Sequence, residues 1–326
     1  MDRRHAIKAG IAGAFSLWTA PLLQAGVAGR DPRSGPGLGD PQVGPGSRPN
    51  GSIRKLSDRL SVLDAGGTNV VALSASDGLT LVDTGMPGSG DRLMADLKGL
   101  GGNGKVQTVF NTHYHLPETG NNEAFAASGA TIVAHDRTRQ WMSIDHWLPD
   151  ANRYEKARPK ATWPTEVFFN SGSRKVGGEQ IDYGYLMVAH TAGDIYVHFR
   201  DSNVLAVGDI ASPVNDPELD WITGAWIGGR VSAMDALLKI GNDQTRVVPG
   251  TGPVMTWAEF KAERELMETV RQRLFKQIRQ GDGPQDMVDG GVLNGLPRTW
   301  KDPYKFLYAA ARGLWGNHNK LDPDVV

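Results

Sequence analysis

The chain of 326 residues contains no cysteine. This absence excludes disulfide bonds, thiolate zinc sites, iron–sulfur clusters and a cysteine nucleophile. A surplus of one charge is also missing, because 35 lysine and arginine residues are balanced by 36 aspartate and glutamate residues and the net charge is -1. Nucleic-acid binders carry a basic surplus, so we expect no nucleic-acid partner. Any metal ion must be bound by histidine and carboxylate side chains.

The N-terminal apolar stretch, residues 9–23, is too short for a membrane span. It has fifteen residues, whereas a transmembrane helix needs about 20. A basic segment, M-D-R-R-H-A-I-K, precedes it, and the small residues Gly26-Val27-Ala28 follow it, as in a signal peptide. The segment D-R-R-H-A-I-K resembles the twin-arginine export signal, with Ala6 where that signal usually has a bulky apolar residue. The alternative is a frayed basic N-terminus.

This resemblance predicts the cellular location of the protein. We expect a signal peptide at residues 1–28, export by the twin-arginine translocation machinery to the periplasm or the medium, and no stable membrane span after cleavage. Residues 31–50 contain five proline and five glycine residues, a composition that cannot bury a core. We therefore expect a linker at residues 29–52 and a folded domain with a C-terminal helical extension at residues 53–326.

Within this domain, β-rich and helical segments alternate. Residues 69–75 and 79–83 read as a hairpin. Further strands are expected at residues 105–111, 131–135, 179–189, 195–200, 204–207 and 245–248, and helices at 91–100, 121–128, 136–144, 231–240 and 257–280, followed by two shorter helices. The polar and aromatic residues 147–164 read as a long surface loop. Strands interleaved with helices predict a layered α/β fold.

Three histidines and one aspartate directly follow predicted strands. His113 and His115 are two residues apart, and side chains at this spacing on an extended strand lie on one side. Such a pair is weak support for a metal by itself. His190 and Asp209 follow two other predicted strands. Three imidazoles and one carboxylate at strand ends form a ligand set suited to zinc.

The order of motifs around these residues resembles the metallo-β-lactamase-fold hydrolase superfamily from about Leu56 to the C-terminus. The motifs are L-V-D-T-G (81–85), N-T-H-Y-H-L-P-E-T-G-N-N (111–122), A-H-T-A-G-D (189–194), V-G-D (207–209) and V-P-G-T-G-P (248–253). The resemblance implies a four-layered αββα sandwich with metal ions at one edge of its two sheets.

The chain departs from this family in the residues specific to a second metal ion. The family loop reads H-x-H-x-D-H, but Pro117 and Glu118 occupy its last two positions. The family loop P-G-H-G reads P-G-T-G here, with Thr251 in place of histidine. The ligands of the first ion, His113, His115 and His190, and the bridging Asp209 are present. We therefore expect one zinc ion.

The resemblance also suggests catalytic roles. Without an aspartate at position 117, either Glu118 or Asp209 could be the general base, and Glu118 could instead bind the metal. Asp83 is similar to the family carboxylate that holds a ligand histidine in its tautomer, although it could equally be a turn former at a strand end.

Three functions remain open at this point. The leading hypothesis is an exported mononuclear zinc hydrolase that cleaves an ester, lactone, amide or related bond in a small-molecule substrate. The alternative is a non-catalytic periplasmic relative that binds a ligand or partner. A β-lactam-hydrolysing enzyme ranks below both, because a fold does not fix a function.

Overall fold

The structure is a computed structural model that describes residues 52–101, 104–150 and 152–317. The predicted signal peptide and all but the last residue of the predicted linker lie outside these residues. Within the described part of the chain, no helix is both long and apolar enough to cross a membrane.

Seven strands form the first sheet, in the order β1-β2-β3-β4-β5-β6-β9. Neighbours from β1 to β4 pair antiparallel, and the pairs β4–β5, β5–β6 and β6–β9 are parallel. The parallel strands end at one edge, from which the loops after β5 and β6 leave. The strands are β1 (Ile53–Lys55), β2 (Leu60–Asp64), β3 (Asn69–Ala75), β4 (Gly78–Val82), β5 (Val106–Phe110), β6 (Thr131–His135) and β9 (Glu166–Phe168).

Five strands form the second sheet, in chain order from β10 to β14. The first three pairs are antiparallel, and β13 pairs with β14 in parallel. The strands are β10 (Ser171–Val176), β11 (Glu179–Tyr185), β12 (Ile195–Phe199), β13 (Val204–Gly208) and β14 (Arg246–Pro249).

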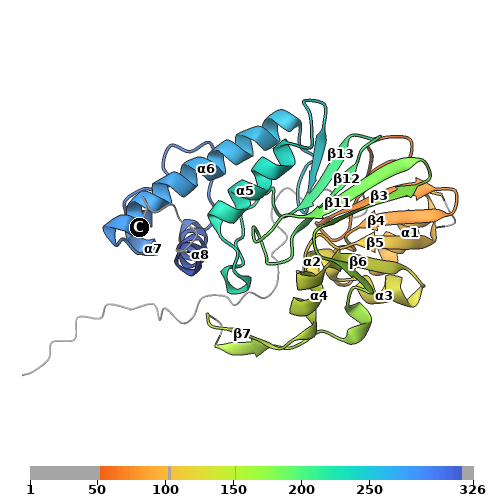
Figure 1. Ribbon diagram of the computed structural model, residues 1–326, viewed down its shortest axis with the longest axis horizontal. Coiled ribbons are helices and arrows are strands. Elements are labelled where there is room, and N and C mark those ends of the chain that lie inside the picture. The colour runs from red at the N-terminus through yellow and green to blue at the C-terminus, as the bar shows by residue number, and fades with distance from the viewer. Residues whose placement is uncertain (1–51, 102–103, 151, 318–326) are drawn as a thin grey trace, which may run out of the picture.

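The two sheets pack face to face, and helices cover both outer faces (Figure 1). Strand β3 shows how its sequence produces this: Val71 and Leu73 belong to the core between the sheets, whereas Val70 and Ala72 belong to the core beneath α1 (Gly90–Lys98) and α3 (Asn122–Ala127). Alternate residues of a strand point to opposite faces, so a strand buried on both faces is apolar throughout. The second sheet is covered by α5 (Ile227–Leu238) and α6 (Trp257–Gln280). The predicted αββα sandwich is confirmed.

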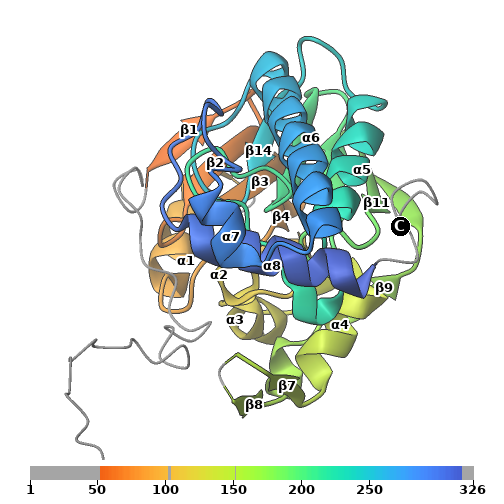
Figure 2. The ribbon, with the colours of Figure 1, turned by 90° about the vertical axis from the view of Figure 1, so that its left-hand side faces the viewer.

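The C-terminal helices extend the outer layer of the second sheet. Helix α6 starts at a capping box, in which Thr256 and Glu259 exchange side-chain and backbone hydrogen bonds. Helices α7 (Pro284–Asp289) and α8 (Pro303–Gly316) follow, and α8 packs against α5 (Figure 2).

Three predicted elements differ from the structure. The expected loop at 147–164 contains a hairpin, β7 (His146–Leu148) and β8 (Arg153–Glu155), which follows α4 (Asp136–Ser143). The strand expected over 179–189 ends at Tyr185, because the chain turns at Met187 with a φ of 60°. Helix α5 starts at Ile227 rather than Val231, and its first turn includes Gly229, where a Cβ would clash with the carbonyl oxygen of Val188.

Candidate metal centre

The predicted ligands lie on loops that leave the two sheets at the same edge. His113 and His115 follow β5, with His115 at the N-cap of the short helix α2 (Leu116–Thr119). His190 lies between β11 and β12, and Asp209 directly follows β13. The backbone N–H of Ile195 in β12 donates to the carbonyl of Thr112 at 2.9 Å. This bond joins the loop of the first sheet to the second sheet and brings the histidines together.

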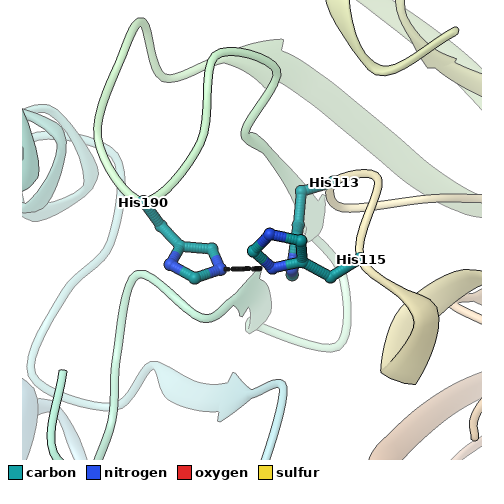
Figure 3. A group of neighbouring side chains, drawn as sticks. All are labelled: His113, His115 and His190. Carbon is teal, nitrogen blue, oxygen red and sulfur yellow. Dashed lines mark hydrogen bonds between the residues drawn. The ribbon is translucent and has the colours of Figure 1, made fainter. Parts of the chain in front are cut away.

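The three imidazoles converge on one point (Figure 3). Nε2 of His190 lies 3.2 Å from Nε2 of His113 and 3.1 Å from Nδ1 of His115. Burial, followed by the neighbouring imidazoles, lowers the pKa of His113 well below its usual value, and burial and His115 lower the pKa of His190 to about 4. Both rings are therefore neutral near pH 7 and have a lone pair for a metal ion.

The other ring nitrogen of each histidine has a partner of its own. Nδ1 of His113 lies 3.1 Å from Oγ1 of Thr112, and Nδ1 of His190 donates to the carbonyl of Glu218 at 2.9 Å. Nε2 of His115 lies 3.3 Å from Oδ2 of Asp220. Partners of this kind fix the tautomer and orientation of metal-binding histidines.

The family resemblance suggested that Asp83 holds a ligand histidine, but in the structure Asp83 contacts Thr112, the residue before His113. Its carboxylate accepts from the backbone N–H of Thr112 at 2.7 Å and from Oγ1 of Thr112 at 2.9 Å. Thr112, not Asp83, contacts the ring of His113. Asp83 thus holds the start of the metal loop, and its direct contact is with threonine.

Two carboxylates complete the site. Oε2 of Glu118 lies 3.2 Å from Nε2 of His113, and Oδ2 of Asp209 lies 3.8 Å from Nε2 of His190. One ligand atom each from His113, Glu118 and Asp209 lies within 4.8 Å of the others. Burial, followed by the charge of Asp209, raises the pKa of Glu118 well above its usual range. Glu118 is 1% exposed, and neither of its oxygens has a hydrogen-bond partner among the described residues.

The P-G-T-G loop closes the site beside these carboxylates. Asn69 of β3 holds it through its side-chain amide, which donates to the carbonyls of Pro249 and Gly252 at 2.8 and 3.0 Å. A Cβ at Gly250 would clash with Oδ1 of Asp209 and lie 3.3 Å from Oε1 of Glu118. A side chain at position 250 would therefore displace the Asp209 carboxylate or the loop.

This donor set fits a metal ion. A buried carboxylate without a hydrogen-bond partner is costly unless a cation compensates it. Here Glu118 lies beside imidazole nitrogens that already face one another, which is the arrangement of ligands around a common cation. His113, His115 and His190 could hold the ion, with Glu118 and Asp209 at its side.

Several residues of this site were missed by the sequence analysis. Asp220 contacts His115 and also accepts from the hydroxyl of Tyr114 at 2.5 Å. Arg230 is fully buried in α5 and donates to the carbonyl of Glu218 at 3.3 Å, the same carbonyl that His190 contacts. Neither residue belongs to a recognisable motif. Asp220 lies in the loop after β13 and Arg230 in helix α5, and the spacing of the metal ligands in the sequence does not indicate either residue.

The αββα sandwich thus brings three histidines and two acids together at one sheet edge. Residues 63–252 match the Metallo-beta-lactamase superfamily. The chain belongs to this superfamily.

Two characterised relatives are distant in sequence. The chain is 24% identical over 247 residues to 2,4-dinitroanisole O-demethylase subunit alpha of Nocardioides sp. (strain JS1661), which covers 74% of this chain and 70% of that protein. It is 26% identical over 145 residues to metallo-beta-lactamase IND-1 of Chryseobacterium indologenes, which covers 44% of this chain and 55% of that protein.

Solved structures share the fold. A metallo-beta-lactamase from Pontibacter korlensis has a TM-score of 0.54 and 18% identity, over 67% of this chain and 98% of that chain. The inverting sec-alkylsulfatase Pisa1 from Pseudomonas sp. has a TM-score of 0.61 and 13% identity, over 84% of this chain and 52% of that chain. At these identities the similarity establishes the fold.

Proposed function

We propose that the protein is an exported hydrolase that uses one zinc ion, held by His113, His115 and His190, to cleave an ester, lactone, amide or related bond in a small molecule. One observation carries this proposal: three imidazole nitrogens converge within 3.1–3.2 Å next to a buried carboxylate that has no hydrogen-bond partner among residues 52–101, 104–150 and 152–317. A zinc ion on three histidines keeps a position open for water and lowers the pKa of that water toward neutrality.

Glu118 is placed to accept the proton of the attacking water. Its carboxylate lies beside the metal-binding nitrogen of His113, and burial raises its pKa. A carboxylate accepts a proton more readily as its pKa rises, so the direction of this shift suits a general base. Asp209 is the second candidate, because it lies beside His190 and is partly open to solvent.

A single ion is favoured by the residues at the other family positions. Pro117 has no ligand atom in its side chain, and Thr251 offers a neutral hydroxyl where the family has an imidazole. A hydroxyl is a poor ligand for zinc compared with imidazole or carboxylate. The three histidines of the first metal site are all present, so only ligands of the second metal site are missing.

The names of similar proteins support hydrolysis without identifying a substrate. They include a beta-lactamase, an alkylsulfatase and a subunit of an O-demethylase for 2,4-dinitroanisole. One fold carries many activities, so a screen should cover esters, lactones, phosphodiesters, alkyl sulfates and β-lactams, each with and without a chelator.

Metal content and turnover together decide between an enzyme and a non-catalytic relative. Protein expressed with zinc should contain about one zinc ion per chain by mass spectrometry. His113→Ala and His190→Ala should lose it, whereas His198→Ala, which removes a histidine from β12 outside the site, should keep it. Absence of zinc in the wild-type protein would overturn the enzymatic proposal. Bound zinc without turnover in the whole screen would favour a binding protein instead.

Export can be tested separately with the full-length chain. Expressed in a bacterial host with a twin-arginine system, the protein should be found in the periplasmic fraction, shortened at the N-terminus near residue 28. The double variant Arg3→Lys, Arg4→Lys keeps the charge and should remain uncleaved in the cytoplasm. Equal export of both forms would contradict the assignment to this pathway.

A further inference from the structure

Arg158 lies beside the metal centre, between the hairpin β7–β8 and the turn at Lys160–Thr162. Its backbone N–H donates to the carbonyl of Met142 at the end of α4 at 2.8 Å, which fixes this part of the chain. Its Nη1 donates to Oγ1 of Thr119 at 2.7 Å, and Oγ1 of Thr119 donates to the carbonyl of His115 at 2.7 Å. One threonine therefore separates the guanidinium from the backbone of a predicted metal ligand.

The guanidinium forms no ion pair within the described part of the chain. It is partly buried, and among the described residues no carboxylate oxygen lies within 4.0 Å of it. Arg298, by contrast, is also partly buried but contacts Glu263 at 2.5 Å. Burial of a charge is costly unless the charge is paired. The bond to Thr119 uses one of the five N–H groups of Arg158, and it is the only side-chain hydrogen bond of this residue in the described part of the chain.

The guanidinium lies near residues of the metal centre, because it contacts Tyr114, whose ring is 4.5 Å from that of His115. The guanidinium lies over the ring of Tyr114, 5.7 Å from its centroid, and Tyr114 separates His113 from His115 in the sequence. Burial and the neighbouring imidazoles lower the pKa of His113, and the charge of Arg158 adds to this effect. A group bound to the free N–H groups would therefore be close to the bond that the metal centre attacks.

We propose that Arg158 binds an anionic group of the substrate, a carboxylate or a sulfate, adjacent to the scissile bond. Guanidinium N–H groups match the two oxygens of such a group and bind it through charge-assisted hydrogen bonds. The substrate class is then an anionic ester, lactone or amide. This inference rests on the hydrolase proposed above.

Kinetics on two matched esters test the proposal. 4-Nitrophenyl butyrate is neutral, and 4-nitrophenyl hemisuccinate has the same leaving group and a carboxylate at the end of its acyl chain. The wild-type zinc protein should prefer the hemisuccinate. Arg158→Met should lower kcat/KM about 10- to 100-fold for the hemisuccinate, the range for hydrogen bonds to charged groups, and less than about threefold for the butyrate.

Two further variants separate recognition from a structural effect. Arg158→Lys keeps the charge without the planar arrangement of donors, so it should retain part of the preference. Lys160→Met removes the same charge at an exposed position two residues away and should leave kcat/KM for both esters unchanged. An equal loss on both esters in Arg158→Met, or no preference for the hemisuccinate in the wild type, would overturn the proposal.

A binding measurement distinguishes failure of this inference from failure of the proposed hydrolase. Succinate and inorganic sulfate are titrated by calorimetry into the zinc-loaded wild type and Arg158→Met. An affinity of the variant that is about 10-fold or more below that of the wild type supports the anion site even if no ester is cleaved. The anion that the wild type binds more tightly shows whether the site prefers a carboxylate or a sulfate. Equal binding to both proteins would overturn the site even if an ester is cleaved.

Discussion

Oε2 of Glu118 lies 3.2 Å from Nε2 of His113, the same nitrogen that faces His190. A metal ion bound to that nitrogen would be close to the carboxylate, so Glu118 is either a proton acceptor beside the ion or a ligand to it. Neither oxygen of this buried carboxylate has a hydrogen-bond partner among the described residues.

Glu118→Gln distinguishes the two roles. If Glu118 is the base, the variant should keep zinc and lose about 10²–10⁴-fold in kcat, because the amide cannot accept the proton. Zinc content by mass spectrometry and kcat on the best substrate of the screen are the measurements. Loss of zinc would make Glu118 a ligand, and unchanged kcat with zinc bound would transfer the role of base to Asp209.

The contact between Asp220 and His115 controls how protons compete with the metal. Burial alone would lower the pKa of His115, but the hydrogen bond to Asp220 and the nearby acids outweigh it and raise that pKa. Protonated imidazole cannot bind a metal. Zinc affinity of the wild type should therefore fall as the pH drops through this raised pKa, above the usual value of 6.5.

Asp220→Asn should move this transition to lower pH, because the ring loses the carboxylate that stabilises its charge. Zinc affinity at high pH should also fall about 10- to 100-fold, as for other partners of metal-binding histidines. NMR titration of His115 in the metal-free protein and zinc affinity from pH 5 to 8 measure both effects. Tyr114→Phe is the matched control, since it removes the other donor to Oδ2 of Asp220 and keeps the charge. An unchanged transition in Asp220→Asn would contradict the assignment.

Much of this site could be predicted because its ligands follow strand ends in recognisable motifs. His113, His115 and His190 converge as the motifs indicated, and strands such as β6 (Thr131–His135) match their predicted bounds. The partners of these histidines could not be predicted. Asp220 lies 105 residues after His115 in an irregular loop, and only the folded backbone places the two together.

The hairpin β7–β8 was missed for a different reason. Its strands have three residues each and carry exposed aromatic side chains, Trp147 and Tyr154, whose rings contact each other at 5.1 Å. Such short strands show no alternation of buried and exposed residues, so the sequence has no pattern to detect. Because the hairpin could not be predicted, the position of Arg158 beside the metal centre could not be predicted either.

Gly250 tests the packing of the P-G-T-G loop against the acids. In Gly250→Ala, the new methyl group would clash with Oδ1 of Asp209, so the carboxylate or the loop must move. We expect a loss of stability of about 1–3 kcal/mol and weaker zinc binding, measured by denaturant unfolding and calorimetry. Gly316→Ala is the control, because a Cβ there meets no atom within 4 Å. Unchanged zinc affinity in Gly250→Ala would show that Asp209 is not held near the ion.

The last prediction concerns the second metal ion. The triple variant Pro117→Asp, Glu118→His, Thr251→His restores the family ligands next to Asp209, which is already in place. Pro117 lies in the first turn of α2, where the backbone needs no proline, and the side chain at position 118 already lies beside His113. If ligand chemistry alone prevents a second ion, the variant should bind about two zinc ions per chain by mass spectrometry.

The double variant Glu118→His, Thr251→His is the control for this gain, because it lacks the new carboxylate and should bind the second ion more weakly. One zinc ion in the triple variant would contradict the prediction. The cause would then be the backbone position of the loop at 250–252. Asn69 holds this loop against β3 through its amide, and the loop backbone determines which atoms a side chain at position 251 can reach. Releasing that contact in the triple variant by Asn69→Ala should then allow the second ion to bind.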